Sequence, residues 1–186
     1  DIYVSRRKSA SAPFESPTSL GPTINTAASE SSPFVTADER TLLFGRGVPR
    51  MIYQATRTNR DASFGEPKQL ANVNRGVWQE FPRLTNDGLH LILVSSRAQG
   101  SQRLWRASRD SIAADFGPLV PLGPTINQGI MSGPSLSSDE TTLYFSSERP
   151  NGYGGRDLWF SRRVPKRSVA ETAALKPDET KDHAPP

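Results

Sequence analysis

Two glutamates, Glu30 and Glu80, come nearest in this sequence to a pair of groups that could do chemistry. Glycoside hydrolysis needs two carboxyl groups flanking the scissile bond, one as acid and one as nucleophile or base. Each glutamate lies just before a predicted inner strand, whereas the corresponding residues 131–133 contain no acid. The two glutamates could therefore form a catalytic pair or an ion site, but pairing with nearby arginines is the interpretation that we favour.

Other routes to catalysis have weaker support in the sequence. Nucleophilic catalysis needs a base within reach of the nucleophile, and the only two histidines are His90 and His183. His90 falls in a predicted strand at 89–94, where a strand side chain is the simpler interpretation. There is no cysteine and no Gly-x-Ser-x-Gly sequence, so thiolate chemistry and a serine-hydrolase centre are excluded. We expect no catalytic residue, metal site or cofactor in this chain.

A third group of residues suits binding. Asn25, Asn74 and Asn127 recur in similar loops, and we interpret them first as turn-stabilising residues and second as lining a shared face. Trp78 lies outside the register of the other tryptophans and is the best candidate for an exposed binding aromatic. The predicted binding set is Glu30, Asn74, Trp78, Glu80 and Asn127.

These candidates are positioned by a repeat of about 50 residues, which is the dominant feature of the sequence. Aromatic residues recur at spacings of 50, 52 and 54, each with an arginine four residues later. Each predicted turn carries an aspartate five residues after a proline, and the sequence GPTIN occurs at both 21–25 and 123–127. The predicted structural positions are Tyr3, Tyr53, Trp105 and Trp159 for interblade packing, and Asp38, Asp87 and Asp139 for turns.

Each repeat predicts four short strands. Apolar and aromatic runs separated by Asp- and Gly-containing turns are typical of antiparallel hairpins. The expected strands are 1–7 and 17–20; 32–36, 41–45, 51–56 and 67–71; 81–84, 89–95, 103–108 and 118–122; and 134–137, 142–147 and 157–162.

Four short strands per period of about 50 residues indicate a β-propeller blade. The units resemble the WD40-like repeats of TolB-type propellers, in the Pro134-x-Leu-Ser-x-Asp139 turn, the 143–147 strand and the Gly154-Gly-x-Asp-Leu-Trp159 strand. The resemblance covers residues 1 to about 164. It implies an all-β fold and a non-catalytic scaffold that binds a protein or a cell-envelope ligand through loops at the channel mouth. The alternative function is that of the propeller domain of a carbohydrate-active enzyme, or of a serine peptidase whose catalytic part lies outside this chain.

About three blades give an incomplete ring, because propellers have four to eight. The sequence begins at Asp1 inside a repeat, so we expect further blades before it; completion by a second chain is the less favoured arrangement. Unpaired blade edges would favour self-association. We assign 1–164 to the propeller repeats, and 165–186, which has few large apolar residues, to a disordered tail or linker.

Composition limits the partners. The net charge of +4 could suggest a polyanion, but no basic cluster is interleaved with stacking aromatics, so we expect no nucleic-acid partner. No run approaches the roughly 18 apolar residues of a spanning helix. By resemblance we expect a periplasmic or extracellular protein, with a protein or envelope glycan as partner.

Overall fold

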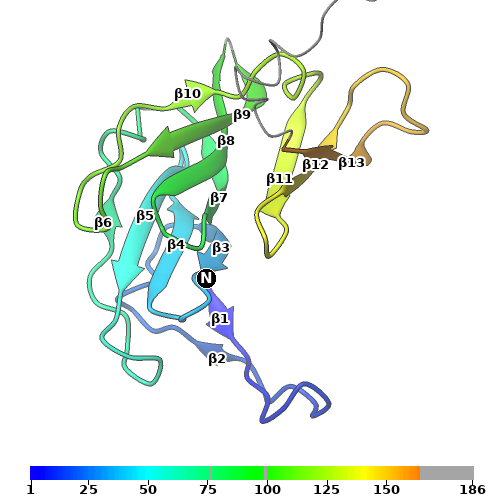
Figure 1. Ribbon diagram of the computed structural model, residues 1–186. Coiled ribbons are helices and arrows are strands. Elements are labelled where there is room, and N and C mark those ends of the chain that lie inside the picture. The colour runs from blue at the N-terminus through cyan, green and yellow to red at the C-terminus, as the bar shows by residue number, and fades with distance from the viewer. Residues whose placement is uncertain (76, 99, 164–186) are drawn as a thin grey trace, which may run out of the picture.

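The computed structural model describes residues 1–75, 77–98 and 100–163, and the regular elements of that part are all β-strands (Figure 1). The two-stranded sheet comprises Tyr3–Val4 (β1) and Thr18–Ser19 (β2). The two four-stranded sheets comprise Glu30–Val35 (β3), Thr41–Arg46 (β4), Met51–Thr56 (β5) and Lys68–Gln69 (β6), then Gln79–Leu84 (β7), His90–Ala98 (β8), Ser101–Ser108 (β9) and Val120–Pro121 (β10). The three-stranded sheet comprises Met131–Leu136 (β11), Thr142–Ser147 (β12) and Asp157–Arg162 (β13).

The predicted all-β architecture is confirmed, and each larger sheet is an antiparallel meander in chain order. The inner strands β3, β7 and β11 contact one another in succession. In the two-stranded sheet Tyr3 pairs with Ser19, as Tyr53 pairs with Gln69 and Trp105 with Pro121. This sheet therefore corresponds to the third and fourth strands of a blade. The described sheets do not close into a ring (Figure 1).

The fourth strands are shorter than the sequence predicts, with two residues each. Proline supplies no backbone N–H and therefore ends or interrupts a ladder. Pro17 and Pro67 stand immediately before β2 and β6, and Pro121 lies within β10. Residues 165–186, predicted to form a tail, lie outside the described residues, as does Val164.

Each inner strand has an irregularity at the repeated proline. The register shifts between Ser31 and Phe34 in β3, and at the corresponding points of β7 and β11. The residue before the proline has a positive φ in all three strands: 52° at Ser32, 53° at Phe81 and 53° at Gly133. Such bulges bend a strand, so the proline marks a bend that recurs in every blade.

The repeated aspartates accept hydrogen bonds within the turns that join the first two strands. The hydroxyls of Thr36, Thr85 and Ser137 donate to Asp38, Asp87 and Asp139 at 2.5 Å in each case. A backbone N–H two residues after each aspartate donates to the same carboxyl oxygen. The hydroxyl bond is the main cause that lowers the pKa of all three carboxyl groups, and the backbone bond adds to it.

These lowered pKa values predict how stability depends on pH. A carboxyl group with a lower pKa in the folded state stabilises the fold above its unfolded pKa, about 3.9 for aspartate, and that contribution is lost as pH falls through the folded pKa. We expect the urea concentration at the unfolding midpoint to decrease as the pH is lowered below about 4. The decrease should be less steep in a D38N/D87N/D139N variant. Equal slopes in the two proteins between pH 2.5 and 5 would contradict this role.

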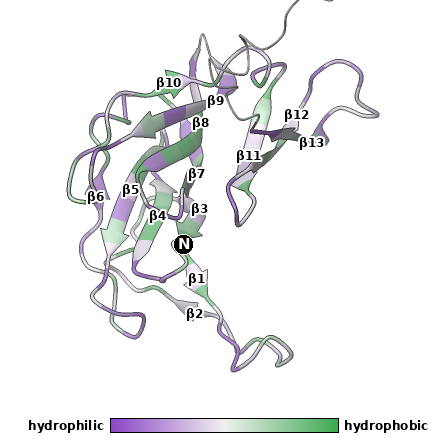
Figure 2. Cartoon of the chain, in the orientation of Figure 1, coloured by the Kyte–Doolittle hydropathy of each residue, from purple (hydrophilic) through white to green (hydrophobic). Residues whose placement is uncertain are grey.

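The hydrophobic core lies between successive sheets. One buried cluster joins Leu43 and Ile52 of the first four-stranded sheet to Leu84, Leu91 and Leu93 of the next. A second cluster links the two-stranded sheet to β4 and β5, and a third links β8 and β9 to β11 and β12. The central strand β8 is largely hydrophobic in Figure 2. Each sheet thus depends on its neighbour for burial of apolar surface.

Candidate functional site

Glu30 is buried and lies in an ion pair. The Nε of Arg46 lies 3.1 Å from its carboxylate, and the backbone N–H and hydroxyl of Thr26 donate to the same oxygen. Arg46 also donates to the carbonyl of Ile24, at 2.7 Å. The carboxylate therefore anchors the loop that enters β3.

Glu80 lies in a second ion pair, with Arg50. The Arg50 guanidinium also lies over the ring of Trp78, 4.7 Å from its centroid, and the Arg50 carbonyl accepts from the N–H of Gln79. Arg50 thus ties the β4–β5 turn to the start of β7. Trp78 is half-buried beneath this guanidinium.

The two glutamates occupy different positions of the repeat. Glu30 pairs with Arg46 in the ladder, and its counterpart in β7 is Gln79, which pairs with Ser95. Glu80 is the next residue, and successive side chains of a strand point to opposite faces. Each carboxylate faces its own arginine, so the structure does not bring them together as a pair.

The recurring asparagines bind the third strand of the preceding sheet. Asn74 accepts from the Ile52 N–H at 2.9 Å and donates to the Ile52 carbonyl at 2.8 Å. Asn25 makes the same two bonds to Ile2, and Asn127 makes them to Leu104. Each amide makes the two backbone hydrogen bonds that a residue of a neighbouring strand would make. Its donors and acceptor are therefore used inside the molecule.

The aromatic residues of the third strands lie beneath arginines. Guanidinium groups stand 4.9 Å from the ring centroid of Tyr53, 5.4 Å from that of Trp105 and 5.0 Å from that of Trp159. The three rings pack against the buried clusters between sheets. Tyr3 differs: it is 58% exposed, because the described two-stranded sheet has no inner strands to cover it.

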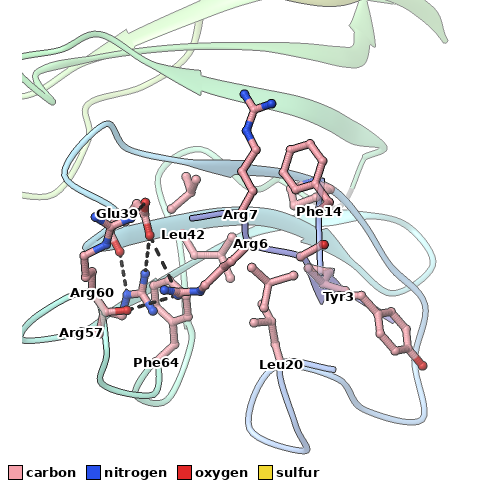
Figure 3. Close-up of a pocket in the computed structure, with 15 residues that line it drawn as sticks. Tyr3, Arg6, Arg7, Phe14, Leu20, Glu39, Leu42, Arg57, Arg60 and Phe64 are labelled. Atoms are coloured by element: carbon pink, nitrogen blue, oxygen red, sulfur yellow. Dashed lines mark hydrogen bonds and ion pairs between the residues drawn. The ribbon is translucent and has the colours of Figure 1, made fainter. Parts of the chain in front are cut away.

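A pocket that sequence reasoning missed lies where the two-stranded sheet meets the first four-stranded sheet (Figure 3). We call it the junction pocket. Its volume is about 510 Å³. Residues from β1, β3, β4 and the loop after β5 line it, and its apolar part includes Phe14, Leu20, Val35, Leu42 and Phe64.

Positive charge gathers at one side of the junction pocket. The carboxylate of Glu39 is shared by three guanidinium groups, at 2.6 Å from Arg60, 3.3 Å from Arg57 and 3.9 Å from Arg6 (Figure 3). The side chain of Arg57 is 7% exposed, whereas those of Arg6 and Arg60 are 40% and 64% exposed. Arg7 lies above the ring of Phe14, at 4.8 Å. The four arginines and one carboxylate leave a local charge of about +3.

The junction between the two four-stranded sheets shows which of these charges belong to the repeat. A pocket of about 330 Å³ lies there, lined by Thr56, Arg109 and Ile112, the counterparts of Arg6, Arg57 and Arg60. Arg109 donates to the Gly88 carbonyl and stacks on Phe116, as Arg57 donates to the Glu39 carbonyl and stacks on Phe64. The arginine at this position is therefore structural. Arg60 departs from the repeat, which has Ala10 and Ile112 at that position, whereas the position of Arg6 holds Thr56, Ser108 and Arg162 in the other copies. Arg60 is therefore the sequence signal that could have identified the pocket.

Other site chemistry is sparse in the described ranges. No group of three or more His, Cys, Asp or Glu residues in residues 1–75, 77–98 and 100–163 could hold a metal ion. The same ranges contain no helix with the length and apolarity needed to cross a bilayer.

Comparison with known proteins identifies the fold. No family model matches the sequence, and no curated protein does. TolB from Acinetobacter baumannii aligns with a TM-score of 0.53 and 21% identity over 70% of this chain and 29% of its own. The catalytic domain of a GH62 α-L-arabinofuranosidase from Coprinopsis cinerea aligns with a TM-score of 0.55 and 13% identity, over 85% of this chain and 64% of its own. An endo-arabinase from Bacteroides thetaiotaomicron aligns with a TM-score of 0.58 and 13% identity, over 89% of this chain and 66% of its own.

This chain spans less than two thirds of each of these proteins. At such identities the likeness concerns the fold alone. Meandering four-stranded sheets, cores between successive sheets and these three neighbours together show that the chain has a β-propeller-like fold.

Proposed function

We propose that this chain is a non-catalytic binding module, built from WD40-like repeats of the TolB type, that holds an anionic partner in the junction pocket. The observation that carries this proposal is that Arg6 and Arg60 add positive charge at this junction, where the junction of the two four-stranded sheets has Thr56 and Ile112. Exposed guanidinium groups beside an apolar floor suit a ligand with both an acidic and an apolar part. The partner class is a protein or a cell-envelope molecule, in the periplasm or outside the cell.

The contacts of the predicted channel-mouth residues support binding at the junction pocket over binding at the mouth. Glu30 and Glu80 are in ion pairs, and the amides of Asn74 and Asn127 bind backbone groups. A ligand that used these side chains would first have to break those internal contacts. Arg6 and Arg60 also contact Glu39, but three guanidinium groups share that one carboxylate. These two side chains are 40% and 64% exposed, so a ligand can reach them without breaking a buried contact.

Calorimetric titration with two polyanions tests the proposal and separates the partner classes. Poly-L-glutamate represents an acidic polypeptide, and polygalacturonate represents an acidic envelope glycan. We expect one of them to bind at low salt, and an R6A/R60A variant to bind it at least tenfold more weakly. The matched control is R106A, which removes an exposed arginine of β9 that does not line the pocket. The proposal fails if neither polymer binds, or if R106A weakens binding as much as R6A/R60A.

A carbohydrate-active role is the second candidate, because two of the solved structures above are named as an α-L-arabinofuranosidase and an endo-arabinase. The separate ion pairs of Glu30 and Glu80 argue against it, since retaining and inverting hydrolases need two carboxyl groups across one bond. We expect no release of reducing sugar from arabinan or arabinoxylan. Release that is abolished in both E30Q and E80Q would replace the binding proposal.

A further inference from the structure

Asn151 is the one asparagine of this chain that a glycine follows. Asn151 and Gly152 lie in the loop between β12 and β13, and both are exposed (Figure 1). The carbonyl carbon of an asparagine side chain can be attacked by the backbone nitrogen of the next residue. Glycine presents that nitrogen with no Cβ to hinder the approach. The fold can either block this reaction or leave it open.

The other asparagines show how the fold blocks the reaction. Each of them uses its side-chain amide in at least one hydrogen bond: Asn25, Asn59, Asn72, Asn74, Asn86 and Asn127. An amide that turned toward the following nitrogen would break such a bond. In the part of the chain that the structure describes, none of the side-chain hydrogen bonds of loop 148–156 involves Asn151. The Asn151 amide is therefore free to turn.

The geometry of the loop requires the reactive pair of residues. A side chain at Gly152 would collide with the carboxylate of Asp157. That carboxylate accepts from the N–H groups of Tyr153 and Gly154, at 3.0 and 3.4 Å, and so holds the loop closed. Asn151 has a left-handed φ of 69°, a conformation that asparagine adopts more readily than most residues. The loop thus selects glycine at 152 and favours asparagine at 151.

We infer that Asn151 is a site of spontaneous deamidation. The Gly152 nitrogen gives its proton to solvent base and forms a bond to Cγ of Asn151. The bond from Cγ to Nδ2 breaks, and the nitrogen leaves as ammonia after taking a proton from solvent. Water then opens the cyclic imide at either of its two carbonyl carbons, which yields aspartate or isoaspartate at position 151. The reaction does not involve the junction pocket, so its outcome leaves the proposed function untouched.

The products change both the charge and the backbone of this loop. Either product adds one negative charge to a loop that already carries the carboxylates of Glu148 and Asp157. Isoaspartate also lengthens the main chain by one methylene group. Both changes act on a loop that is held by the Asp157 carboxylate and by the ion pair of Arg156 with Glu148 at 2.8 Å. Conversion therefore gives the protein two forms that differ at one surface loop.

Peptide mapping by mass spectrometry measures the conversion in the folded protein at mildly alkaline pH. We expect the peptide with Asn151 to gain the mass difference between an amide and an acid, and to separate into aspartate and isoaspartate forms. This gain should be at least tenfold faster than at any other asparagine. The matched control is N151Q, because the longer glutamine side chain closes its larger ring much more slowly. The same mass gain in N151Q would place the reaction at another residue and overturn the inference.

Unfolding in urea separates the contribution of the fold from that of the sequence. Asn74 and Asn127 lose their backbone bonds when the chain unfolds, so their conversion should accelerate. The rate at Asn151 should rise less than tenfold. A rise of tenfold or more would mean that the folded loop protects the site, and the inference fails. It also fails if Asn151 converts no faster than the hydrogen-bonded asparagines in the folded protein.

Discussion

Trp105→Ala is expected to lower the free energy of unfolding by about 3–5 kcal/mol, the usual cost of deleting a large aromatic side chain from a core. Trp105 packs against the cluster that joins the two four-stranded sheets, and Arg97 covers its other face at 5.4 Å. Its indole N–H has no acceptor in the structure, so the substitution removes packing and no hydrogen bond. Because small domains have about 5–15 kcal/mol in total, this loss is a large fraction of the stability.

Urea denaturation followed by circular dichroism measures this effect. The matched control is Tyr153→Ala, since Tyr153 is fully exposed in the loop before β13. We expect that variant to stay within about 0.5 kcal/mol of the parent, as surface substitutions do. A midpoint for Trp105→Ala no lower than that for Tyr153→Ala would show that the repeated aromatics do not hold the sheets together.

The sequence predicted the strands well, because two local signals coincide in each repeat. Alternating apolar residues define the strands, and an aspartate with a hydroxyl residue two positions earlier closes each turn. Thr85, Asp87 and the N–H of Leu89 form such a unit without help from distant residues. The fourth strands were predicted too long, because their ends depend on whether a proline leaves N–H groups for pairing. The strand predicted at 1–7 was also too long, since β1 covers only Tyr3–Val4.

The candidate site was harder to predict, because its contacts join residues of different repeats. Glu30 lies three residues before Pro33 and Glu80 two residues before Pro82, and a shift of one residue moves a side chain to the other face of a strand. The repeat therefore indicates that the two positions differ, but only the structure shows which arginine each glutamate contacts. The junction pocket depends on Arg6 meeting Glu39 and Arg60. Comparing repeats position by position would have marked Arg60 as an exception, but only the structure shows that it shares a pocket with Arg6.

Asn74→Ala should cost about 2–4 kcal/mol, although Asn74 lies in a loop. The variant leaves the Ile52 N–H without its acceptor inside the protein, and a buried donor left unsatisfied costs about 1–3 kcal/mol. It also removes one of two bonds to the Ile52 carbonyl, which keeps the N–H of Leu70 as a donor. Asn59→Ala, in an exposed turn, is the matched control, and we expect it to cost less than about 1 kcal/mol.

Hydrogen exchange at one amide distinguishes this mechanism from a general loosening. In Asn74→Ala the Ile52 amide should exchange faster by more than the change in global stability accounts for, while the Leu104 amide, held by Asn127, should follow global stability. Asn74→Asp keeps an acceptor for the Ile52 N–H but cannot donate to the Ile52 carbonyl. It should therefore restore protection of that amide more than it restores the unfolding free energy. Equal exchange of the Ile52 amide in the Ala and Asp variants would mean that the asparagine does not act as a substitute strand partner.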